Sequence, residues 1–171
     1  MANYARMALA RIYYEKKDFE FALDQYKKIV NRTNAGAIQM MAYYKMGLCY
    51  LLLDKSLLSV RAFESVLSYK VPTGGSKMPR DKDFERKDVR VEALLASVRP
   101  ISDLSAEELR DNPKYRNTLQ YYLDMAPDRA AYRAVLPRLG KRMDFKKRFQ
   151  DAADVWLEYT KEATNEVQIR E

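Results

Sequence analysis

The longest apolar stretch of the chain is MMAYYKMGLCYLLL, Met40 to Leu53, in which Lys45 is the one charged residue. It is shorter than the roughly 20 apolar residues that cross a bilayer, and it lacks the alternation of a half-buried strand. A helix of this composition is apolar around most of its circumference, which is typical of a helix buried on several sides. The pattern therefore predicts a helix packed between neighbouring elements.

A pair of small residues recurs along the chain at a constant spacing. The two residues stand 12 positions apart in Ala10 and Ala22, Gly47 and Ser59, and Gly140 and Ala152. A bulky apolar residue directly precedes the first small residue each time, and an aromatic residue follows the second by four positions. Small residues allow two antiparallel helices to cross closely, and large residues one turn away fill the space beside them. The spacing therefore predicts a helix hairpin at each occurrence.

This pattern resembles the tetratricopeptide repeat (TPR), a helix hairpin of about 34 residues with the signature W-x2-L-G-x2-Y…A-x3-F…P. The matching residues are Tyr13, Ala22, Gly47, Tyr50, Phe63, Leu139, Gly140 and Ala152. The chain departs from the signature with Arg6, Tyr43 and Leu136 where tryptophan is typical, and with Ser59 and Trp156 in place of alanine and phenylalanine. The resemblance implies an all-α solenoid of about four antiparallel helix pairs.

We expect one helical array over residues 1–171, and we expect it to be a piece of a longer protein because a helical pattern begins almost at the first residue. The expected repeats lie at about 3–33, 40–69, 88–125 and 129–164. Glycine, proline and dense mixed charge fill the stretch 70–87, which predicts a charged loop between the second and third repeats.

The third repeat is degenerate, because it lacks the constant spacing of small residues. Its first helix is predicted from Val89 to Val98, and Arg99-Pro100 is expected to end it. The stretch from Ser105 to Glu108 has the form of a capping box and predicts the start of a second helix that runs to Leu123. Asn112-Pro113 is expected to interrupt or kink that helix.

The chain is basic, with a formal charge of +7, and it contains no histidine and a single cysteine, Cys49. The absence of histidine removes the usual general base and the commonest metal ligand. A lone cysteine inside an apolar run is typical of a small core residue, and it excludes a disulfide framework. No glycine-rich phosphate loop follows a predicted strand. We therefore predict a protein that is not an enzyme and has no metal or cofactor.

The family resemblance also implies a binding surface, because the first helix of each pair lines the inner groove of a TPR array. The residues that this places in the groove are Tyr4, Met7, Arg11, Tyr14, Met41, Tyr44, Leu48, Leu51, Lys141 and Phe145. Tyrosine and methionine suit adaptable recognition of a peptide or helix, and Arg11 and Lys45 favour an acidic partner. In the alternative reading, Leu48 and Leu51 pack against a neighbouring repeat. The implied function is a scaffold or adaptor that binds a protein or peptide.

A cluster of basic residues supports an alternative function, a helical repeat protein that binds RNA or another nucleic acid. The cluster lies at the turn between the last two predicted helices and contains Arg138, Lys141, Arg142, Lys146, Lys147 and Arg148. Such binding needs a patch that continues over several repeats with stacking aromatic residues. Acidic residues such as Asp151 and Asp154 dilute the charge here, so we expect no nucleic-acid partner.

A looser resemblance concerns the tract EALLASVRPISDLSAEELRDNP and the later tract YYLDMAPDRAAYRAVL. Both are similar to bacterial TPR proteins of the cell envelope, including those of gliding-motility assemblies. The similarity implies a periplasmic or envelope-associated location, with the cytoplasm as the alternative. No stretch of the chain predicts a membrane span.

Overall fold

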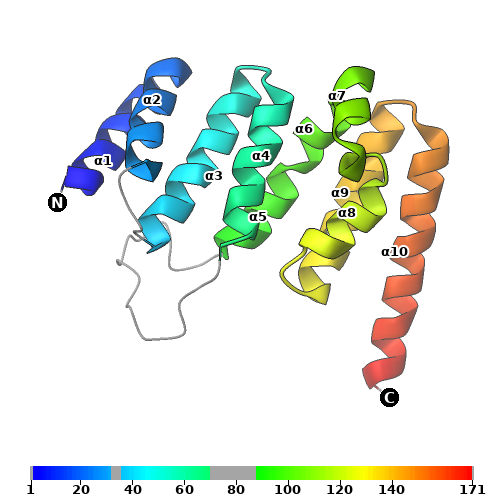
Figure 1. Ribbon diagram of the computed structural model, residues 1–171. Coiled ribbons are helices and arrows are strands. Elements are labelled where there is room, and N and C mark those ends of the chain that lie inside the picture. The colour runs from blue at the N-terminus through cyan, green and yellow to red at the C-terminus, as the bar shows by residue number, and fades with distance from the viewer. Residues whose placement is uncertain (1, 32–35, 70–87, 171) are drawn as a thin grey trace.

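The computed structural model describes residues 2–31, 36–69 and 88–170, and the predicted loop at 70–87 lies outside them. All regular secondary structure of the described residues is helical. In chain order the helices are α1 (Ala2–Glu15), α2 (Phe19–Val30), α3 (Gly36–Leu52), α4 (Ser56–Leu67), α5 (Val89–Ala96), α6 (Val98–Ser102), α7 (Ala106–Asp111), the 3₁₀ helix η1 (Pro113–Tyr115), α8 (Thr118–Met125), α9 (Arg129–Phe145) and α10 (Phe149–Arg170). They stand in a row from α1 and α2 to α9 and α10, and neighbouring helices pack against each other (Figure 1).

The same tight turn joins α1 to α2, α3 to α4, and α9 to α10. In each turn one residue adopts the left-handed backbone conformation: Lys17 (φ 64°), Asp54 (φ 54°) and Lys147 (φ 58°). The next backbone N–H donates to the carbonyl five residues earlier, at 2.9–3.0 Å, in the pairs Asp18 to Tyr13, Lys55 to Tyr50 and Arg148 to Met143. This is the hydrogen-bond pattern of a Schellman motif, which ends one helix and reverses the chain. The three hairpins that the spacing predicted therefore share one turn geometry.

In two hairpins, an aromatic ring of the second helix packs directly against a glycine of the first. A Cβ atom added to Gly47 would lie 2.5 Å from the Phe63 ring, and one added to Gly140 would lie 2.7 Å from the Trp156 ring. Both distances are shorter than any normal contact. Ala22 and Ala152, the second small residues of their hairpins, are also buried. The prediction that these positions mark close helix crossings is confirmed.

Ser59 replaces the usual alanine of the pattern without leaving a polar group unsatisfied. Its hydroxyl is buried and donates a hydrogen bond of 2.8 Å to the backbone carbonyl of Gly47 on the facing helix. A buried hydroxyl without such a partner would destabilise the fold. The hydrogen bond therefore makes serine compatible with this crossing.

The prediction that Arg99-Pro100 ends a helix is wrong. The helix α5 already ends at Ala96, and Pro100 lies inside the first turn of α6. Proline has no N–H to donate to the carbonyl four residues earlier, here Ala96, but it is tolerated in the first turn of a helix. The backbone stays near helical geometry at Ser97, which accepts a 3.1 Å bond from the Ile101 N–H. The proline therefore divides a nearly continuous helix.

The second half of the degenerate region is broken where its sequence predicts. The capping box is present: Glu108 N–H donates to the Ser105 hydroxyl at 3.1 Å, and Ser105 N–H donates to the Glu108 carboxylate at 2.8 Å. The helix α7 ends directly before Asn112-Pro113, and the chain continues as η1 and then α8. This region consequently consists of short helices, whereas the hairpins on either side of it contain longer ones.

Candidate binding surface

One face of the row brings aromatic side chains of α1 and α3 together around a lysine. The Lys45 Nζ atom lies 5.7 Å from the centroid of the Tyr14 ring and 6.0 Å from that of the Tyr44 ring. An ammonium group at this range is attracted to the negative face of an aromatic ring. Lys45 therefore links two tyrosines that stand 30 positions apart in the chain.

The same face continues onto α5 and α9. Burial raises the pKa of Tyr44, the negative charge of Glu92 on α5 raises it further, and Arg138 on α9 acts in the opposite direction. Charges shift a pKa in this way only when they are near the titrating group, and α5 packs against both α3 and α9. We call the set Tyr14, Tyr44, Lys45, Glu92 and Arg138 the tyrosine face. It gathers residues from four helices of the row.

Packing inside the hairpins holds both tyrosine rings. The Tyr14 ring meets Phe19 edge-on with centroids 5.4 Å apart, and the Tyr44 ring is tilted against Phe63 at 6.0 Å. Burial also raises the pKa of Tyr14. Each tyrosine remains half-buried, with part of its surface open. The rings are thus fixed before any partner binds, which lowers the entropic cost of binding.

The residues of α1 and α3 that the family resemblance placed in a groove follow the helical spacing of Tyr14 and Tyr44, which puts them on the same sides of these helices. Met7 packs with Tyr14 against the core formed by α1, α2 and α3. Leu48 packs with Tyr44 against the core around Phe63, so Leu48 belongs to the packing between neighbouring helices, as the alternative reading expected. The remaining predicted residues of α1 and α3 are the exposed Tyr4 and Arg11 and the half-buried Met41 and Leu51.

The predicted residues on α9 share one side of that helix with Arg138. Lys141 and Phe145 follow Arg138 by three and seven positions, and this spacing places residues on one helix face. Both are exposed, and the Arg142 guanidinium lies 5.1 Å from the Phe145 ring centroid. They therefore extend the α9 edge of the tyrosine face toward the last turn.

Sequence reasoning missed Glu92 and assigned Arg138 to the basic turn alone. The spacing pattern of small residues is absent from the α5 region, so no register was available to show which side of α5 faces the row. The polar position of Glu92 between the apolar Val91 and Ala93 was the available signal. That signal does not show whether the Glu92 carboxylate lies near a neighbouring helix or in solvent.

Three of the six residues of the basic cluster form internal ion pairs. Arg142 and Lys146 both reach the Asp103 carboxylate, at 2.7 and 2.6 Å, and Arg148 pairs with Asp151 at 2.6 Å. A cation that is paired with a carboxylate attracts the phosphate groups of a nucleic acid less strongly than an unpaired cation does. This geometry weakens the nucleic-acid alternative.

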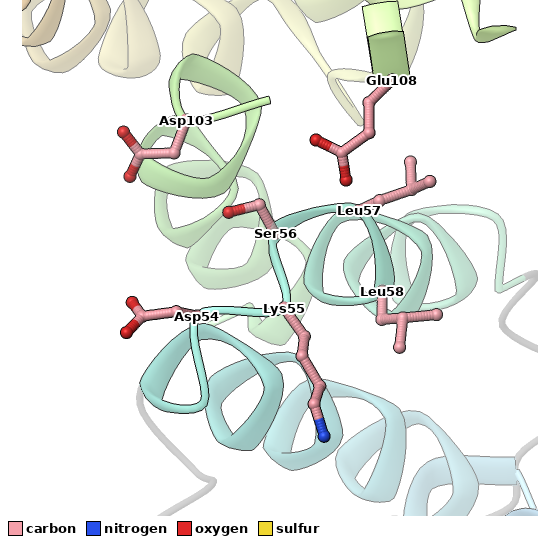
Figure 2. Close-up of a pocket in the computed structure, with 7 residues that line it drawn as sticks. All are labelled: Asp54, Lys55, Ser56, Leu57, Leu58, Asp103 and Glu108. Atoms are coloured by element: carbon pink, nitrogen blue, oxygen red, sulfur yellow. The ribbon is translucent and has the colours of Figure 1, made fainter. Parts of the chain in front are cut away.

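A pocket of about 350 Å³ lies where the turn between α3 and α4 approaches α6 and α7. It is lined by Asp54, Lys55, Ser56, Leu57, Leu58, Asp103 and Glu108 (Figure 2). In the close-up, the Asp103 and Glu108 carboxylates do not converge, and the Lys55 side chain extends away from both. Asp103 is held by Arg142 and Lys146, and Glu108 caps α7. Both carboxylates therefore have structural partners.

No protein-family model matches this sequence, and the searches of curated proteins and of solved structures likewise return no match. Within the ranges that the structure describes, no helix combines the length and the apolar character that a membrane span requires.

Proposed function

We propose that the chain is a TPR-like helical array that acts as a non-enzymatic scaffold and binds a protein or peptide through the tyrosine face. The observation that carries the proposal is the placement of Lys45 between Tyr14 and Tyr44, on the first helices of two successive hairpins. The three equivalent turns and the glycine crossings support the TPR-like assignment.

The chemistry of the face suits a polypeptide ligand. Tyrosine and arginine are enriched where proteins bind each other, and a few anchored aromatic residues supply most of the affinity in such contacts. Lys45 and Arg138 on the face, with Lys141 beside it, outnumber the single carboxylate of Glu92. Arg11 adds little to this balance, because it pairs with Glu15 at 3.0 Å. This balance favours a partner segment that carries acidic residues next to an apolar or aromatic anchor.

A binding test can use acidic peptides selected from a displayed random library against the folded chain. The double variant Tyr14→Ala/Tyr44→Ala should lose at least about tenfold in affinity for the selected peptides, because even one anchor of this kind contributes about 1.4 kcal/mol or more. Circular dichroism should show unchanged helix content, since both rings are only half-buried.

The matched control is Leu123→Ala/Phe149→Ala, which removes two exposed apolar side chains of α8 and α10. This control should bind the peptides as the unmodified chain does. Equal affinity of the folded tyrosine variant and the control would place the binding surface elsewhere.

A further inference from the structure

The last hairpin leaves open a surface that is buried in the earlier ones. Two positions on the second helix of each hairpin can be compared. The position one residue after the small residue is Leu23 in α2, Val60 in α4 and Ala153 in α10. The position seven residues after it is Ile29, Val66 and Tyr159 in the same helices. In α2 and α4 these positions are at most 5% exposed, because the next helix covers them. In α10, Ala153 is exposed and Tyr159 is 37% exposed. We call Ala153 and Tyr159 the trailing face.

The first hairpin shows the complementary opening on α1. Three positions on the first helix of a hairpin can be compared: five residues before the first small residue, one before it and two after it. In α3 these are Ala42, Met46 and Cys49, and each is at most 7% exposed. The equivalent residues of α1 are Ala5, Leu9 and Ile12. Leu9 and Ile12 are 39% and 48% exposed, and Ala5 is also exposed. We call these three residues the leading face.

Inside the chain, the buried versions of these two faces meet. Leu23 and Ile29 of α2 belong to the same core as Ala42, Met46 and Cys49 of α3. The positions of the trailing face are thus the α2 side of a helix–helix contact that this chain already makes, and those of the leading face are the α3 side. The two ends of the row carry both halves of one kind of interface.

We propose that the trailing face of one copy of this chain docks on the leading face of a second copy, in the way that α2 packs on α3. Exposed apolar patches of this kind usually mark interaction sites. The second copy is the indicated occupant because its α1 offers the apolar complement at the equivalent positions. The contact is heterologous, since different surfaces meet, and it produces head-to-tail chains unless a ring closes.

The test uses two variants, each blocked on one face. Leu9→Glu/Ile12→Glu blocks the leading face, and Ala153→Glu/Tyr159→Glu blocks the trailing face. All four positions are exposed, so the fold should tolerate them. In sedimentation velocity, the unmodified chain should grow in mass as its concentration rises, and each variant alone should stay monomeric. An equimolar mixture should form a dimer and nothing larger, because one intact pair of faces remains.

A disulfide test locates the contact directly. Under mild oxidation, a chain with Ile12→Cys should form a disulfide with a chain carrying Ala153→Cys, while Leu123→Cys serves as the control position. The native Cys49 is fully buried, and burial raises the pKa of its thiol to about 12, so it should not compete. An unmodified chain that remains monomeric at millimolar concentration overturns the proposal. The proposal is also overturned if both variants fold and each still self-associates on its own.

Discussion

At the scale of single residues, the helix hairpins depend on the absence of a side chain at two crossings. Phe63 is fully buried against Gly47, whereas Trp156, which covers Gly140, is only half-buried and bonds through its indole N–H to Asp144 at 3.2 Å. A buried ring has no room to move, but a ring at the surface can shift outward. The two glycines therefore differ in how much they tolerate a methyl group.

We expect Gly47→Ala to lower the free energy of unfolding by about 1–3 kcal/mol, the usual cost of overpacking a core. Gly140→Ala should cost much less, because the half-buried Trp156 ring can shift outward. The gain in helix propensity of alanine over glycine, up to about 1 kcal/mol, is the same at both positions. Urea unfolding monitored by circular dichroism measures both. Equal losses in the two variants would show that the burial of the facing ring does not decide the outcome.

At the turn residues with left-handed backbone conformation, we predict that glycine stabilises the fold. A residue with a Cβ atom is strained by about 1–2 kcal/mol in this conformation, and glycine is not. Lys147→Gly and Lys17→Gly should therefore raise the free energy of unfolding, by up to about 1 kcal/mol each, because glycine also loses more entropy on folding. Lys16→Gly is the matched control and should not stabilise, since Lys16 has no positive φ. A stabilised control and an unchanged Lys147→Gly would contradict the turn geometry.

At the scale of elements, an ion-pair cluster fastens α6 to α9. The Asp103 carboxylate at the end of α6 accepts hydrogen bonds from Arg142 at 2.7 and 2.8 Å and contacts Lys146 at 2.6 Å. Burial acts to raise the pKa of Asp103, but the hydrogen bonds from Lys146 and Arg142 outweigh it and hold the pKa below the usual 3.8. Because the folded pKa is depressed, the charged form stabilises the fold.

This stabilisation is complete above the unfolded-state pKa and disappears as the pH falls through the lower folded-state value. Asp103→Asn should therefore cost about 1–3 kcal/mol at neutral pH. The difference between the variant and the unmodified chain should shrink in acid well below pH 3.8. Urea unfolding at both pH values measures it, and a loss that is independent of pH would contradict the role of the charge.

The sequence predicted the regular hairpins well because their signal is local. The contacts of Gly47 with Phe63 and of Gly140 with Trp156 span one hairpin each, so a fixed spacing records them. The α5–α8 region was less predictable, because two prolines divide it and long-range contacts such as Arg142 to Asp103 hold it in place. The helix end expected at Arg99-Pro100 was wrong because a proline is also tolerated in the first turn of a helix, as Pro100 is in α6.

The residues of the candidate site likewise fall into those that the sequence could place and those that it could not. Tyr14 and Tyr44 could be placed from the register of their hairpins, and the structure brings both to Lys45. Glu92 could not be placed, because no register pattern extends over α5. A surface assembled from four helices depends on how the pairs stack, and single-sequence spacing carries little information about stacking.

At the scale of the whole molecule, the row of helices gathers the tyrosine face from residues spread over positions 14 to 138. The tyrosines and Lys45 lie on the hairpins of α1 to α4, and Glu92 and Arg138 lie on α5 and α9. The face therefore exists only when the row is assembled. A partner that binds it should also stabilise the stacking of these helices, since binding to the folded form shifts the unfolding equilibrium.

The most direct test of this account replaces Tyr44 with a photo-crosslinking phenylalanine analogue in the source cells. Position 44 should form covalent adducts with a protein, and Lys45→Glu in the same chain should reduce them strongly by repelling an acidic segment. The analogue at position 123, on α8, should give few adducts. Adducts at position 123 without adducts at 44, or adducts at 44 with nucleic acid in place of protein, would contradict binding of a protein partner at the tyrosine face.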